Sequence, residues 1–467
     1  MRFRQLFLIS IIFYAFLLRV WNLAALSFWI DESFSILSAI KVLEHGVPLL
    51  DSGLLYARSL PHTYLLSAMG VLFGFGEWPM RLPSVLLGVL AVWLVYRCAS
   101  IMISSRAGLC AAALTALSHT QVLWSRQARM YMLLEVLLFA ALFFALWWQD
   151  KGLYKFLVLS ACSAFLASFT HVFGSLAFIP LMVLLLEKRR LWIKHAKNLK
   201  LWQSLSLVFA ILVFAVYASW TAFSLFSHYT LINLSRFYSG YLFDTSFAVI
   251  LFALVGIAVI KPRYAVILGS IFVATFCMAS FFSGAIHMRY LSFVLPVLFI
   301  LSSALLDFCF SHSSIGKMIA LFGLLAILWT GFLFVPSVPR FNDQTPQPNF
   351  RAAAAFIAHQ DSGIIASAYS APLLVYGVEP DFVIDFDMQD RERHSWHALW
   401  YGTDYYSGLP TIMDVQDLLA ARPHYILVDD LALSRLDKTL ASAIKNNSIA
   451  FEDDPRWWDG IRVYEMQ

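Results

Sequence analysis

Asp31 and Glu32 stand side by side where the first apolar stretch of the chain ends, within "SFWIDESFSI" (27–36). The chain around them is 60% hydrophobic and only 13% charged, with a mean hydropathy of +0.72. A carboxylate within hydrogen-bond reach of an acceptor hydroxyl can take its proton as a general base. Two hydrated acids at a membrane surface would give the same pattern, and this plainer interpretation stays open.

Several arginines could work beside these acids as phosphate ligands, because guanidinium groups bind phosphate in a bidentate geometry. They occur in "YARSLPH", "SRQARMY" and "HMRY", each of which also contains a tyrosine. Together, acids and arginines at one membrane face could hold an anionic lipid head group while activating an acceptor. Arg126 and Arg129 could equally be interfacial residues whose stems lie along apolar surface. The candidate ligands are Arg58, Arg126, Arg129, Tyr131, Arg289 and Tyr290.

Other common kinds of site have no support in the sequence. All five cysteines lie in hydrophobic segments, without a CxxC pair or a Cys/His cluster, so neither a disulfide framework nor a cysteine-based zinc site is indicated. Neither GxxxxGK[ST] nor a helix-opening GxGxxG is present.

The elements that would position these residues are membrane helices, since a hydrocarbon core of about 30 Å needs about 20 apolar residues. The stretch "YLLSAMGVLFGFG" (64–76) is too short to span and is expected to lie along the interface. Eleven spans are predicted, at 5–26, 81–102, 107–125, 131–149, 153–170, 172–187, 203–226, 245–260, 264–283, 290–310 and 316–336.

The distribution of Lys and Arg predicts the orientation of these spans. Segments such as "EKRRLWIKHAKNLK" carry the basic excess typical of cytoplasmic loops. We therefore expect the N-terminus in the cytoplasm, an outward first loop at 27–80 and an outward C-terminus. Arg19 and Trp21 interrupt the first apolar stretch before any cleavage site, which favours a retained anchor over a cleaved signal peptide.

The composition changes after the last predicted span. Residues 337–349 are rich in Pro, Asn and Asp and are predicted to be a linker. Residues 350–467 alternate the helix formers "FRAAAAFIAHQ" and "TIMDVQDLLAARP" with strand candidates "GIIASAY", "DFVIDF", "HYILVDD" and "IRVYEM". The prediction is an α-helical polytopic membrane protein with a C-terminal soluble α/β domain outside the cytoplasm.

The stretch "LRVWNLAALSFWIDESFSI" resembles the first span and loop of the polytopic C-type glycosyltransferases that use polyprenyl-phosphate sugars, in particular the protein O-mannosyltransferase and aminoarabinose transferase group. "EWPMRLPSVLLGVLAVWLVYRCAS", "LWSRQARMYMLLEVLLFAALF", "HMRYLSFVLPVLFILSSAL" and the tail from "NFRAAAAFIAHQ" are similar in order and spacing. One departure is "SLPHTYLL", where relatives often carry Lys-Pro-Pro or His-Pro-Pro; Leu60 and His62 flank Pro61 here.

This resemblance implies a membrane glycosyltransferase, with residues 1–336 as its transmembrane domain, in the cell inner membrane. Asp31 would be the base of an inverting transfer and Glu32 would orient the acceptor. The donor would be a polyprenyl-phosphate sugar and the acceptor a glycan, lipid or protein, with no nucleic acid as a partner. No cofactor is demanded, because arginines can hold one phosphate leaving group, and a divalent metal stays open. The alternatives are an O-antigen polymerase or ligase and a transporter or flippase of lipid-linked sugars.

Overall fold

The computed structural model describes residues 2–187, 247–281, 289–327, 349–360, 363–385, 402–404, 406–453 and 460–466. Contacts divide the chain into two compact units. The first contains Met1–Trp21 and Ser84–Ser337, and the second contains Asn22–Pro83 and Val338–Gln467. Segments from both ends of the sequence therefore meet in the second unit.

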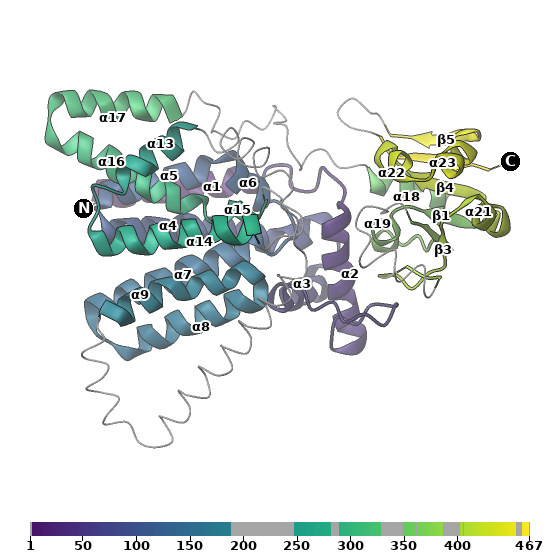
Figure 1. Ribbon diagram of the computed structural model, residues 1–467, viewed down its shortest axis with the longest axis horizontal. Coiled ribbons are helices and arrows are strands. Elements are labelled where there is room, and N and C mark those ends of the chain that lie inside the picture. Colours follow the sequence, from purple (N-terminus) through teal and green to yellow (C-terminus); the bar gives the residue numbers. More distant parts are fainter. Residues whose placement is uncertain are drawn as a thin grey trace, which may run out of the picture. The chain divides into compact units, whose positions relative to one another are not determined.

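The first unit is a helical bundle (Figure 1). Among its described residues, four helical segments are long and apolar enough to cross a membrane, at Phe3–Val20, Glu77–Met102, Tyr131–Lys151 and Leu295–His312, and shorter apolar helices accompany them. Its elements are α1 (Arg2–Val20), α4 (Glu77–Met102, which begins in the second unit), α5 (Ser105–Leu117), α6 (His119–Trp124), α7 (Tyr131–Lys151), α8 (Tyr154–Thr170), η1 (Val172–Phe178), α9 (Ile179–Glu187), α13 (Phe247–Gly256), α14 (Pro262–Phe281), α15 (Arg289–Ser292), α16 (Leu295–His312) and α17 (Ser314–Ile327).

Within the described residues, helices lie at the predicted spans, although only the four segments named above are long and apolar enough to cross a membrane. The stretch 107–125 is two helices, because Ser118 is extended (φ −61°, ψ 125°) and its side chain accepts from Gln121 N–H to begin α6. The stretch 290–310 is likewise divided between α15 and α16, and the first residues of 172–187 form a 3-10 helix. The predicted first span ran too far, because α1 ends at Val20 and the chain then turns through Asn22 at φ 52°. The span at 203–226 lies outside the described residues.

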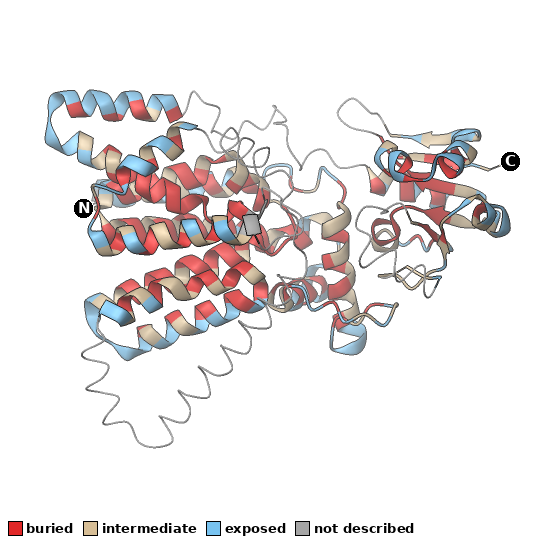
Figure 2. Cartoon of the chain, in the orientation of Figure 1, coloured by how far each residue is buried: buried red, intermediate tan, exposed pale blue. Residues whose placement is uncertain are grey.

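Burial separates the core of the bundle from its apolar surface (Figure 2). α7 and α16 supply fully buried side chains such as Phe139 and Phe299. By contrast, α17 buries only Gly316, Ala320, Gly323 and Ile327, spaced to lie on one face. Most of its other apolar side chains, such as Ile315 and Phe322, are exposed, as expected for a surface that faces lipid.

The part of the second unit that precedes the bundle contains α2 (Ile30–His45) and α3 (Leu60–Phe73). α2 begins with a capping box, in which the Glu32 carboxylate accepts from the backbone N–H of Trp29, and it ends at Gly46 with φ 75°. α3 covers most of the short apolar stretch 64–76. Its 14 residues extend only about 21 Å, too little for a membrane core.

The C-terminal part of this unit is a six-stranded mixed sheet in the order β3-β2-β1-β4-β6-β5. β1 pairs in parallel with β2 and β4, and β6 pairs antiparallel with β4 and β5. The four predicted strands are all present, whereas the short β3 and the half-exposed β5 were not predicted. The elements are α18 (Phe350–Ala358), β1 (Ile365–Ser367), α19 (Ser370–Val375), β2 (Phe382–Ile384), β3 (Thr411–Ile412), α21 (Val415–Ala421), β4 (Tyr425–Val428), α22 (Asp430–Arg435), α23 (Lys438–Lys445), β5 (Ser448–Glu452) and β6 (Arg462–Glu465).

The two parts of the second unit pack together. α19 contacts α2, and Ile30 packs against the apolar core of the tail. Phe34 of α2 lies against Tyr406, with ring centroids 4.3 Å apart. The helix that carries Asp31 and Glu32 is therefore supported by a domain more than 300 positions further along the chain.

Candidate active site

Asp31 and Glu32 occupy the first turn of α2 rather than an irregular loop. Successive helical residues point about 100° apart, so two adjacent acids must face different surroundings. Both are placed where the positive end of the helix dipole favours negative charge. The two acids differ in burial, since Glu32 is buried and Asp31 is only partly buried.

Glu32 is fully buried and forms a bidentate ion pair with Arg81 of α4. Arg81 Nε donates to Glu32 Oε1 at 2.8 Å, and Arg81 Nη2 donates to Oε2 at 2.7 Å. The side chains are only 1% and 5% exposed, so water screens this pair very little. Glu32 is therefore engaged in an internal ion pair, a partner that the sequence did not indicate.

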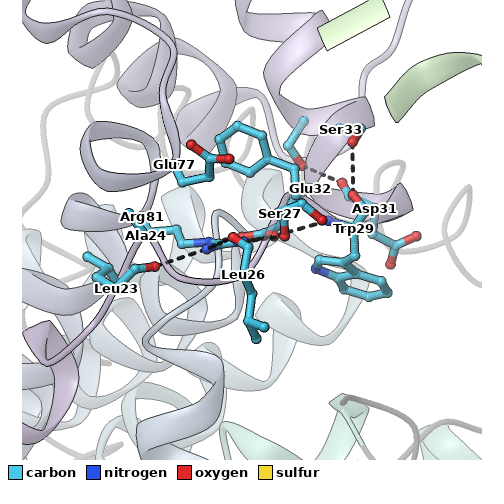
Figure 3. Close-up of polar contacts among 12 residues, drawn as sticks. Leu23, Ala24, Leu26, Ser27, Trp29, Asp31, Glu32, Ser33, Glu77 and Arg81 are labelled. Atoms are coloured by element: carbon cyan, nitrogen blue, oxygen red, sulfur yellow. Dashed lines mark hydrogen bonds and ion pairs between the residues drawn. The ribbon is translucent and has the colours of Figure 1, made fainter. Parts of the chain in front are cut away.

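Arg81 uses all five of its N–H donors. Besides the two bonds to Glu32, it donates to the carbonyl oxygens of Leu23, Leu26 and Ser27 at 2.8–3.0 Å. Its guanidinium also lies 5.2 Å from the centre of the Phe28 ring. Figure 3 shows Arg81 reaching this backbone and Glu32 together. Arg81 thus fixes the turn between α1 and α2 and joins it to the first turn of α2.

The tail holds the same turn through Arg351 of α18. Its guanidinium donates to the carbonyl oxygens of Ala24 and Ala25, at 3.4 and 3.1 Å, and to Glu77 Oε1 at 3.0 Å. With the bonds from Arg81, the five consecutive carbonyls of residues 23–27 all accept from one of two guanidinium groups.

Tyr376, which follows α19, makes a second connection from the tail. Its hydroxyl accepts from the backbone N–H of Phe28 at 2.7 Å and donates to Glu77 Oε1 at 2.9 Å. Its ring stacks on Phe28, with centroids 5.9 Å apart. Burial, with a further contribution from the charge of Glu77, raises the pKa of the Tyr376 hydroxyl above its usual range. Tyr376 therefore stays protonated at physiological pH and remains a donor to Glu77.

Asp31 is only partly buried, unlike Glu32. Its side chain points away from the Arg81–Glu32 pair (Figure 3). The backbone carbonyl of Asp31 accepts from the Ser35 hydroxyl at 3.1 Å, which is a helix-internal contact. The Asp31 residue thus lies on a supported helix end and is partly exposed.

The remaining candidates are distributed over both units. Arg58 is exposed in the second unit, 6.0 Å from the Tyr56 ring centre. Arg126 belongs to the first unit and donates to the backbone carbonyls of Leu18 and Trp21, so it satisfies the C-terminal end of α1.

Two more candidates are buried in the first unit. Arg129 is 5% exposed, and Tyr131 begins α7 with its ring edge-on to Trp124 at 4.7 Å. Arg289 and Tyr290 form the start of α15, and their side chains lie outside the described part of the structure.

Sequence reasoning did not single out Glu77, Arg81, Arg351 or Tyr376. A signal was available for two of them, since Glu77 and Arg81 are spaced i, i+4 at the end of an apolar span. A charged pair there suggests a specific partner. Among the residues that the structure describes, no group of three or more His, Cys, Asp or Glu side chains is arranged to hold a metal.

Comparisons with known proteins bear on the family and the fold of the chain. The family model for dolichyl-phosphate-mannose-protein mannosyltransferase matches residues 58–220. No curated protein matches the chain.

Solved structures share the fold over nearly the whole chain. ArnT from Cupriavidus metallidurans, solved with undecaprenyl phosphate, has a TM-score of 0.64 at 16% identity, over 98% of this chain and 97% of ArnT. The oligosaccharyltransferase AglB from Archaeoglobus fulgidus, solved with an inhibitory peptide and a dolichol-phosphate, has a TM-score of 0.57 at 11% identity, over 100% of this chain and 74% of AglB. The arabinofuranosyltransferase AftD from Mycobacteria matches at a TM-score of 0.52 and 15% identity, over 99% of this chain and 41% of AftD.

Proposed function

We propose that this chain, a membrane glycosyltransferase that uses lipid-linked sugar donors and resembles the protein O-mannosyltransferase and ArnT enzymes, transfers a sugar from a polyprenyl phosphate to an acceptor hydroxyl on the outer face of the membrane. The observation that carries the proposal is the division of labour between the adjacent acids. Both carboxylate oxygens of Glu32 are paired with Arg81, whereas Asp31 is partly exposed at the same end of the helix.

In the proposed reaction Asp31 is the general base. Its carboxylate takes the proton of the acceptor hydroxyl as the acceptor oxygen forms a bond to the anomeric carbon of the sugar. The bond from that carbon to the phosphate oxygen breaks, and the electron pair leaves with the polyprenyl phosphate. Attack from the face opposite the phosphate inverts the anomeric centre. Glu32 acts indirectly in this scheme, by holding Arg81 and with it the start of α2.

The leaving phosphate needs positive charge. We assign this role to Arg129, Arg289 and Arg58, with Tyr131 and Tyr290 as neighbouring hydroxyl donors. Arg126 is a weaker candidate than the sequence suggested, because its guanidinium is already bonded to the end of α1. Replacement of any of these residues should weaken the use of the polyprenyl-phosphate donor and leave the general base in place.

The packing within the second unit supports an outward site next to an outward tail. Residues of the first loop and the tail share hydrogen bonds and an apolar core, so both must lie on the same side of the membrane. With α1 as a span, the N-terminus and the tail lie on opposite sides. This agrees with an odd number of spans, eleven in our proposal, and with basic loops in the cytoplasm.

The test of this proposal is the Asp31→Asn variant, which nearly preserves shape but removes the proton-accepting charge. Mass spectrometry of envelope glycans and lipids, from cells with and without the chain, identifies the sugar that is added. The corresponding undecaprenyl-phosphate sugar then serves as donor for the purified protein in liposomes. The expected result is a fall of ~10² to 10⁴ in transfer rate, with unchanged affinity for undecaprenyl phosphate.

Ser35→Ala is the matched control. Ser35 lies one turn further along α2, and the replacement removes the hydroxyl that donates to the Asp31 backbone carbonyl. It should transfer sugar at nearly the wild-type rate. Wild-type turnover by Asp31→Asn would contradict the assignment of the base and leave the acids with the plainer role of a hydrated pair.

A further inference from the structure

The tail contacts the turn that leads into α2 through polar groups, and these contacts are concentrated just before Asp31. The Phe28 N–H is two residues ahead of the helix start and is bound by the Tyr376 hydroxyl. Because the same hydroxyl donates to Glu77, it joins three segments: the turn, the start of α4 and the tail. A hydrogen bond to an ionised carboxylate is stronger than one between neutral groups.

Packing reinforces this connection. Phe28 is 1% exposed and lies against the Tyr376 ring on one hand and the Arg81 guanidinium on the other. The Glu77 side chain is only 12% exposed and accepts from both Tyr376 and Arg351. The backbone before Asp31 is therefore held by side chains from α4, α18 and the end of α19.

We propose that Tyr376 is a positioning residue for the transfer reaction: its hydroxyl, bridging Phe28 N–H and Glu77, sets the direction in which the helix start presents Asp31. This inference rests on the proposed function of Asp31. The tail is thereby part of the catalytic apparatus through a defined contact, although Tyr376 itself touches neither the donor nor the reacting atoms. A misplacement of about 1 Å at a reacting group can lower a rate by a factor of about 100.

The decisive variant is Tyr376→Phe, which keeps the stacked ring and removes only the bridging hydroxyl. We expect transfer to fall roughly tenfold, whereas the affinity for undecaprenyl phosphate stays unchanged. Hydrogen exchange of the peptide covering residues 22–35 should become faster, because the Phe28 N–H loses its acceptor. The ratio of wild-type to variant rates should stay constant up to about pH 10, since the raised pKa keeps the hydroxyl protonated.

Tyr369→Phe is the matched control within the tail. Its hydroxyl donates to Asp429 Oδ2 at 2.7 Å, also a buried tyrosine–carboxylate bond, but among tail residues only. Loss of that hydroxyl should lower the stability of the tail without lowering the transfer rate. An equal fall in rate for both variants would show a general effect of tail stability and overturn the positioning role.

The double variant Tyr376→Phe with Glu77→Gln tests the bridge itself. If both residues act through one network, the double variant transfers no more slowly than the slower single variant. If the fold-reduction in transfer rate of the double variant equals the product of the two single fold-reductions, the proposal is refuted. Wild-type turnover by Tyr376→Phe would also refute it.

The Asp31→Asn variant in the same assay separates this inference from the proposed function. If Asp31→Asn loses transfer and Tyr376→Phe keeps full transfer, the positioning role of Tyr376 is refuted and the general-base role of Asp31 stands. Full transfer in Asp31→Asn refutes the general base, and the positioning proposal then fails with it.

Discussion

Replacing both members of the Arg81–Glu32 pair should destabilise the protein by less than the sum of the two single replacements. The two changes are Glu32→Gln, which removes the negative charge at nearly constant shape, and Arg81→Met, which removes the guanidinium at similar length. Removing one member of a buried, hydrogen-bonded ion pair typically costs about 3–5 kcal/mol, because the other charge stays buried.

The contacts of this pair rank the two variants. Glu32→Gln leaves Arg81 bonded to the carbonyls of residues 23, 26 and 27, so we expect a loss near 3 kcal/mol, the lower end of that range. Arg81→Met takes the guanidinium from the buried carboxylate and from those three carbonyls, so its loss should reach about 5 kcal/mol. The double variant has no buried charge at this position and should resemble Arg81→Met, which gives a coupling energy of about 3 kcal/mol.

The assay is a double-mutant cycle on the free energy of unfolding, measured by denaturant titration of the purified protein in detergent micelles. The ion pair between Lys41 and Asp51, at 2.7 Å, is the control in the same unit, because its aspartate is 57% exposed. Coupling there should stay below about 1 kcal/mol. Additive effects at Arg81 and Glu32, within about 0.5 kcal/mol, would refute our account of the buried pair.

Two further predictions concern the bundle and its orientation. Gly88→Ala should destabilise the bundle by about 1–3 kcal/mol, since a Cβ there would meet Ser125 Cβ at 2.6 Å and Arg19 Nε at 2.9 Å. Gly269→Ala is the control, because the nearest atom to its added Cβ would be 3.4 Å away. It should be neutral or stabilising in the same unfolding assay. Reporter fusions at Ser313 and Asn446 should report opposite sides of the membrane, and signals from one side would overturn the proposed outward face of Asp31.

The periodic and compositional signals in the sequence predicted a helical bundle followed by a C-terminal domain with a sheet, and both are present in the described residues. Long apolar runs predicted the membrane helices, because about 20 apolar residues in sequence already satisfy the requirement for a span. Helix breaks were harder to predict. Ser118 is polar but compatible with a helix, and only its extended backbone and its bond to Gln121 divide 107–125 into α5 and α6. The first turn of α2 was also missed, since Trp29 is an unusual residue for a helix cap.

The sequence singled out Asp31 and Glu32 as candidates, but it did not indicate the contacts that distinguish them. Asp31 and Glu32 stood out as two adjacent acids at the end of an apolar span. Nothing in the sequence around them distinguishes the role of one acid from that of the other. Helix geometry separates them by about 100°, and the position of Arg81 then decides which acid is sequestered. Arg81 lies 49 residues from Glu32, and Arg351 lies 327 residues from Ala24. No local pattern could have joined these groups.

The separation of roles follows from how a general base must be held. A base that accepts a proton needs an accessible carboxylate, but its position must not relax when its own charge is neutralised during the reaction. In this chain the helix start is held by bonds of Glu32, Arg81, Arg351 and Tyr376. Each of these bonds joins groups other than the Asp31 carboxylate, so protonation of Asp31 would not remove any of them. Neutralising Glu32 would instead disturb the ion pair that fixes the helix start, which is why we place the base at Asp31 although both acids stand at the same helix end.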